Sequence, residues 1–135
     1  MDEPLTLRES RVIPQRKGEK TREAILNDAV ALASQVGLEG LSIGALALRT
    51  GMSKSGLFAH FGSKEELQRA TLARAEQLFH ERVFQPAMAH AAGLAQLRAL
   101  AENWLAFVDG CDASPGGCLL IPAAIEYDDR PGPVR

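Results

Sequence analysis

Residues 47–61 read ALRTGMSKSGLFAHF, a pattern that predicts two short helices joined by a tight turn. Gly51 is expected to end the first helix, because glycine readily adopts the left-handed conformation that closes helices. Ser53 is placed to cap the second helix, since its hydroxyl oxygen is suited to accept from an amide of the first turn. Leu57 and Phe61 lie four residues apart and therefore share one face. We expect a short helix with an apolar back and a polar, basic start.

An amphipathic helix precedes this pair. Apolar residues recur at spacings of three and four between Ile25 and Val36, which is the period of a helix with one buried face. Gly37 follows as its expected left-handed cap. Ser42 is placed to cap the next helix, which ends at Gly51. Three short helices in succession are therefore predicted within the first half of the chain.

Helical signals continue after the pair. Residues 63–66, Ser-Lys-Glu-Glu, match the capping box, in which the serine accepts from an amide and the glutamate reaches back. They predict a fourth helix over 64–84, with Pro86 marking its end or a kink. Spacing predicts a fifth helix over 94–108. The apolar segment 118–128 is also expected to be helical.

Length and composition fit a soluble helical protein. The chain has 135 residues, of which 46% are hydrophobic and 24% charged, and its aromatic content is 5%. We expect an all-α fold with a disordered basic arm (1–19), a three-helix helix-turn-helix domain (20–66) and an incomplete helical domain (67–135). No apolar run approaches the roughly 20 residues of a membrane span. The charged N-terminus lacks the features of a secretory signal, so the expected location is cytoplasmic.

Basic residues gather near the N-terminus, although the net charge is −2. Residues 8–22 contain two acidic residues, Glu9 and Glu19. They contain six basic residues: Arg8, Arg11, Arg16, Lys17, Lys20 and Arg22. One interpretation is an arm that neutralises phosphates, with Lys17, Lys20 and Arg22 as candidate contacts. An ordinary solvated tail is the alternative.

The second short helix has the features of a DNA recognition helix. Such a helix is short, is held from behind, and presents a polar start to the major groove. Lys54 is suited to a phosphate or a guanine, and the neighbouring serines to phosphates or base edges. His60 and Lys64 lie on the flank where a phosphate strand would pass. Double-stranded DNA is therefore the predicted partner.

Residues 20–67 resemble the TetR/AcrR family of transcriptional regulators. The resemblance lies in the first helix ending at Gly37, Leu41-Ser42-Ile43, Leu46-Ala47 followed by Gly51, the run 53–61 and the run 63–67. It implies the following DNA-binding residues: Ser42, Ser53, Lys54, Ser55, Gly56, Phe58, His60 and Lys64. Phe58 stands where the family usually has tyrosine, so a phenolic phosphate contact is expected to be missing. Gly44 replaces a polar or basic residue that often reaches the DNA.

The resemblance also implies a C-terminal helical domain that binds a small molecule and dimerises through its last two long helices. Those helices are absent from the sequence, and Arg135 stands where a seventh helix would begin, so we expect a truncated chain or a fragment. The implied function is that of a ligand-responsive repressor, a homodimer when full length, with a small apolar effector. Leu100, Trp104 and Phe107 are candidates for the effector pocket. Packing in the core is the alternative for them.

No catalytic or metal-binding pattern emerges, and no enzyme activity or cofactor is expected. His60, His80 and His90 lie in three separate segments, and no serine has an evident base and acid. Cys111 and Cys118 lack the nearby ligands of a metal site, and either a redox pair or two ordinary thiols fits their spacing. The alternative function is that of a non-enzymatic helical module that binds a protein or a ligand. This alternative includes a truncated remnant without DNA binding.

Overall fold

The computed structural model describes residues 17–134, with side chains from Thr21 onward. This range is helical and contains no β-strand, apart from an isolated bridge between Cys111 and Ser114. The predicted all-α class is therefore confirmed. The elements are α1 (Lys17–Val36), α2 (Ile43–Thr50), α3 (Lys54–Phe61), α4 (Lys64–Phe79), a π-helical turn η1 (His80–Phe84), α5 (Gln85–Met88), α6 (Leu94–Val108) and α7 (Leu120–Tyr127).

Serines and glycines set the ends of the first helices, as predicted. Each of α2, α3 and α4 begins with a serine Oγ that accepts from the amide three residues on: Ser42 from Ala45 (3.1 Å), Ser53 from Gly56 (3.0 Å) and Ser63 from Glu66 (3.1 Å). Glycines with positive φ end α1, α2 and α3: Gly37 (81°), Gly51 (69°) and Gly62 (74°). One detail differs from the predicted capping box, because the Glu66 carboxylate pairs with Arg69 at 3.5 Å.

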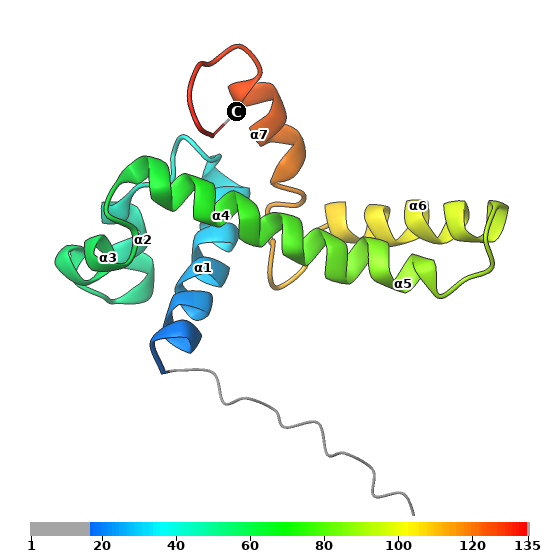
Figure 1. Ribbon diagram of the computed structural model, residues 1–135, viewed down its shortest axis with the longest axis horizontal. Helices are drawn as coiled ribbons and strands as arrows, with labels where there is room; N and C mark the ends of the chain where they lie inside the picture. The colour runs from blue at the N-terminus through cyan, green and yellow to red at the C-terminus, as the bar shows by residue number, and fades with distance from the viewer. Residues whose placement is uncertain (1–16, 135) are drawn as a thin grey trace, which may run out of the picture.

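A single apolar core joins the first four helices to α7. Its buried members are Ile25, Ala29, Val30, Ala33, Leu38, Leu41, Leu46, Ala47, Leu57, Phe61, Leu67, Ala75, Leu78, Leu119 and Ala123. Helices α2 and α3 form one end of the molecule, α4 runs from there along its length, and α5 and α6 lie at the far end (Figure 1). Because Leu119 and Ala123 share this core, the packing crosses the predicted domain boundary after residue 66.

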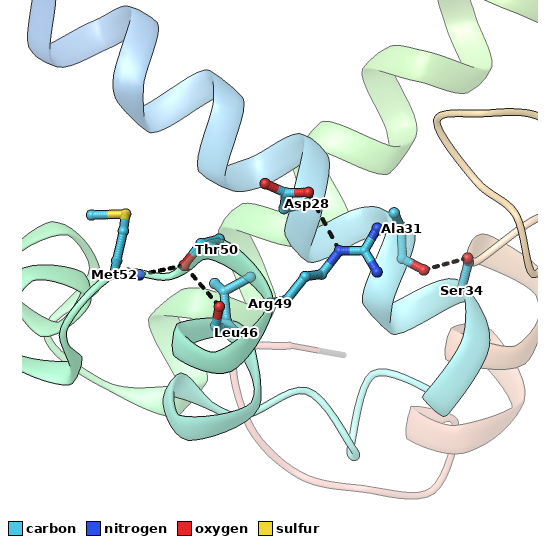
Figure 2. Close-up of polar contacts among 7 residues, drawn as sticks. All are labelled: Asp28, Ala31, Ser34, Leu46, Arg49, Thr50 and Met52. Atoms are coloured by element: carbon cyan, nitrogen blue, oxygen red, sulfur yellow. Dashed lines mark hydrogen bonds and ion pairs between the residues drawn. The ribbon is translucent and has the colours of Figure 1, made fainter.

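Polar contacts fix α2 against α1 and shape the turn that leads into α3. Arg49 of α2 reaches across to α1, where its Nε lies 3.3 Å from Oδ1 of Asp28 (Figure 2). The Thr50 hydroxyl donates to the Leu46 carbonyl at 2.9 Å and accepts from the Met52 amide at 3.4 Å. Since the ion pair is exposed, it contributes at most about 1 kcal/mol to stability. The buried core therefore supplies most of the free energy that keeps α2 packed against α1.

Two boundaries differ from the sequence-based expectation. Helix α1 begins at Lys17, so residues 17–19 are helical and not part of the arm, whose residues 1–16 lie outside the described range. The helical path after α4 continues past Pro86 to Met88. Proline has no amide to donate and crowds the preceding turn. The chain accommodates it by widening that turn, where the Gln85 amide donates to the His80 carbonyl five residues back.

The turn between α6 and α7 lies directly on α1. The Gly116 amide donates to Ser34 Oγ at 2.9 Å, and a Cβ on Gly116 would overlap the Ser34 carbonyl oxygen. Only glycine therefore allows this approach of the two backbones. Helix α7 follows with Pro122 in its first turn, where an amide has no partner within the helix to lose. No helix in residues 17–134 has the length and apolar character that crossing a membrane requires.

Candidate nucleic-acid interface

Helix α3 presents a polar start on an apolar back. Leu57 and Phe61 are buried in the core, at 0% and 4% exposure, whereas Lys54 and Ser55 are exposed. Phe58 is 55% exposed although it is a large apolar residue. The predicted division of the helix into a buried and an outward face is therefore confirmed.

The start of α3 meets the start of α2. A Cβ on Gly44 would lie 3.5 Å from Cε and 3.7 Å from Nζ of Lys54, and 4.0 Å from Oγ of Ser42. Ile43, Lys54, Ser55 and Phe58 line a shallow open hollow on the same surface. The structure thus brings Ser42 and the first residues of α3 together, although they are eleven or more positions apart in the sequence.

The serines at the starts of α2 and α3 make hydrogen bonds within the protein itself. Ser53 Oγ accepts from the Gly56 amide and lies 3.2 Å from Ser55 Oγ. Ser42 Oγ accepts from the Ala45 amide in the same way. All of these groups lie at helix N-termini, where amides and the helix dipole favour a nearby anion. Ser53 and Ser55 are exposed, so their hydroxyls remain accessible to a partner.

Arg22 holds the last turn of α3 in place. Its Nη1 donates to the His60 carbonyl oxygen at 2.8 Å, and its guanidinium lies 4.8 Å from the centre of the Phe61 ring. This residue was a candidate arm contact, but it belongs to α1 and its guanidinium is engaged within the protein. Lys17 and Lys20 also belong to α1, and their side chains lie outside the described range.

No acidic residue occurs between Leu41 and Ser63, a stretch that includes both α2 and α3. Its basic residues are Arg49, Lys54 and His60. The nearest acid toward the N-terminus is Glu39, whose Oε1 lies 3.7 Å from Nζ of Lys64. Helices α2 and α3 therefore contribute no carboxylate of their own that would repel a polyanion, and the Asp28 carboxylate of α1 beside them is paired with Arg49.

Of the candidate effector-pocket residues, Phe107 is buried and packs edge-on against Phe79, with ring centres 6.1 Å apart. It also lines a hollow of about 280 Å³ with Arg82, Asn103, Ala106 and Cys111. Trp104 is 39% exposed and Leu100 is half-buried. Phe107 is thus a buried residue that also lines this hollow, whereas Leu100 and Trp104 are more exposed.

Another hollow, which the sequence did not reveal, lies between α4 and α7. It has a volume of about 290 Å³ and is lined mainly by apolar residues, including Leu72, Leu120, Ala123, Tyr127 and Val134. Tyr127 and the adjoining Arg130 also contact Glu39 in the α1–α2 turn. No local spacing in the sequence links residues this far apart, which explains why they were missed.

Comparisons with known proteins agree with this architecture. The model of bacterial regulatory proteins of the tetR family matches residues 25–71, which contain α2, α3, most of α1 and the first half of α4. The model of the tetracyclin repressor-like C-terminal domain matches residues 93–135. The chain belongs to the TetR family. The comparison with curated proteins gave no match.

The chain is also similar to a solved structure of a TetR regulator. A TetR transcriptional regulator from Chloroflexus aurantiacus J-10-FL superposes with a TM-score of 0.77 at 30% sequence identity. The match covers 90% of this chain and 61% of that one, so the chain spans less than two thirds of the length of this relative. The match includes the helical C-terminal part as well as the helix-turn-helix, because it covers nearly the whole chain.

Proposed function

We propose that this TetR-family chain is a DNA-binding transcriptional regulator that reads an operator half-site with α3. One observation carries the proposal: the exposed polar start of α3 stands on a buried apolar back, within a stretch from Leu41 to Ser63 that contains no acidic residue. A recognition helix needs this combination, because its exposed residues meet the DNA while its buried residues fix its orientation. Leu57 and Phe61 anchor α3 in the core, and Arg22 holds its last turn.

We assign some side chains of this surface to base edges and others to phosphates. Lys54 and Ser55, at the exposed start of α3, face base edges, where lysine pairs with guanine. Phe58 contacts the groove with an apolar ring, and Gly56 adds no side chain that would keep the backbone away. Ser42, Ser53, His60 and Lys64 contact phosphates, because three of them lie at helix N-termini and His60 lies on the flank of α3.

We further propose a ligand-responsive repressor that acts as a homodimer in the cytoplasm. The hollow lined by Phe107, of about 280 Å³, and the hollow between α4 and α7, of about 290 Å³, support an apolar effector because small-molecule sites are concave and mainly apolar. In a dimer, the two copies of α3 would enter successive major grooves about 34 Å apart. An effector that changes this spacing would release the DNA.

Enrichment from a random duplex library tests the function. The purified chain is expected to select a defined sequence. The logarithm of the association constant for that duplex should fall linearly with the logarithm of the salt concentration. The slope should be about −0.9 for each phosphate neutralised. If no sequence is enriched and no salt-dependent binding appears, the helical interaction module becomes the better account of the chain.

A further inference from the structure

The carboxylate of Glu39 joins three parts of the chain. Its Oε2 accepts a hydrogen bond from Tyr127 Oη at 2.7 Å and lies 3.1 Å from Nη1 of Arg130. Its Oε1 lies 3.7 Å from Nζ of Lys64, at the start of α4. The Glu39 amide in turn donates to Oε1 of Glu126 at 3.1 Å. The α1–α2 turn is thus tied to the end of α7 on one side and to Lys64 on the other.

These contacts are unequal in strength. Charge-assisted hydrogen bonds to a carboxylate are about 2.5–2.7 Å long from a hydroxyl and about 2.7–2.9 Å from a charged nitrogen, so Tyr127 makes a normal hydrogen bond and the Lys64 contact is a loose ion pair. Glu39, Lys64 and Arg130 each leave about half of their side chain exposed. The Arg130 guanidinium also lies 5.3 Å from the centre of the Tyr127 ring, which keeps the two donors of Glu39 together. By distance, the two donors from the C-terminal segment therefore make closer contacts with this carboxylate than Lys64 does.

We propose that Glu39 is the positioning residue through which α7 sets the availability of Lys64 for DNA phosphate. This rests on the proposed DNA-binding function. With Tyr127 and Arg130 in place, the Glu39 charge is drawn toward α7 and Lys64 is held only loosely. When those donors are lost, the same carboxylate is left to Lys64 and competes with phosphate for it. Tyr127 also lines the hollow between α4 and α7, so a ligand seated there touches the residue that controls Glu39.

A double-mutant cycle measured on the selected duplex over a salt series tests the proposal. Glu39→Gln should tighten DNA binding about two- to fivefold, the size of an exposed ion pair, and steepen the salt slope by up to about 0.9. Tyr127→Phe should weaken binding by a similar factor. In a Lys64→Ala background both effects should disappear, because the group on which they act is gone.

Two further variants keep the result interpretable. Glu65→Gln removes the same charge beside Lys64 in the sequence, so any effect it has should persist in the Lys64→Ala background. Arg130→Gln removes the second donor of Glu39 and should act like Tyr127→Phe, which provides an independent readout if one variant fails to fold. Circular dichroism establishes that each variant is folded.

The outcomes distinguish failure of the proposed DNA binding from failure of the proposed coupling through Glu39. If the unaltered chain shows no salt-dependent DNA binding, the proposed function fails. If it binds, but Glu39→Gln and Tyr127→Phe change affinity equally with and without Lys64, the coupling through Glu39 is overturned. Loss of both effects on removing Lys64 supports it.

Discussion

The hydroxyl of Tyr127 donates a 2.7 Å hydrogen bond to the carboxylate of Glu39, which lies 88 positions earlier in the chain. Burial of the phenol, followed by this hydrogen bond and the Glu39 charge, raises the pKa of Tyr127 to about 12. The same hydrogen bond, followed by the charge of Lys64, lowers the pKa of Glu39. The contact thus favours a neutral phenol and an ionised carboxylate.

Titration of Tyr127 tests this contact directly, because the chain has one tyrosine and its absorbance as tyrosinate reports this residue alone. A midpoint of about 12 is expected in the folded chain and about 10 in the unfolded chain. The free energy of unfolding therefore contains a contribution from the raised pKa of Tyr127. This contribution is complete below pH 10 and is lost as the pH rises toward 12. Glu39→Gln should lower the midpoint without restoring it fully, since burial remains. Identical midpoints in the two proteins would rule out the proposed role of Glu39.

Gly116→Ala should destabilise the chain, because the added methyl group would overlap the Ser34 carbonyl oxygen on α1. The expected loss is about 1–3 kcal/mol in the free energy of unfolding, the range for forced overpacking. Gly44→Ala is the matched control, since Gly44 lies within α2 and its methyl group would make an ordinary contact at 3.5 Å with Cε of Lys54. It should stabilise the chain by about 0.5–1 kcal/mol, because alanine is the better helix residue. Equal effects in urea denaturation would contradict the docking of this turn.

Leu57→Ala should show that α3 depends on its buried face. The side chain is 0% exposed, and replacing a buried leucine costs about 2–5 kcal/mol in the free energy of unfolding. Leu48→Ala on α2 removes the same atoms from a side chain that is 88% exposed, and it should change stability by less than about 0.5 kcal/mol. Chemical denaturation compares the two variants. A small loss for Leu57→Ala would mean that α3 is not anchored by this residue.

Much of the fold could be predicted because its signals are local. Ser42, Ser53 and Ser63 each cap a helix through the amide three residues later, and Gly51 closes α2, so a few neighbouring residues define each boundary. Periodicity likewise placed α1 and α6 close to their observed bounds. These are the parts of the fold for which short-range backbone chemistry suffices.

The parts that sequence reasoning missed depend on distant partners. Nothing near Glu39 in the chain points to its contacts with Tyr127 and Arg130. Position 116 requires glycine because of the backbone of Ser34, which lies 82 positions earlier. Arg22 was placed with the basic arm because charge counting does not show that its guanidinium reaches α3. Such contacts follow from tertiary packing, which has no spacing rule in the sequence.

The most direct test of α3 as the reading helix compares Lys54→Ala with Lys64→Ala on the selected duplex and on a scrambled duplex. Lys54→Ala should cost about 1–3 kcal/mol of binding free energy on the selected duplex and reduce its preference over the scrambled one. Lys64→Ala should weaken binding to both duplexes alike and make the salt slope shallower by about 0.9. Unchanged affinity and unchanged sequence preference for Lys54→Ala would contradict the assignment of α3 as the DNA-reading element.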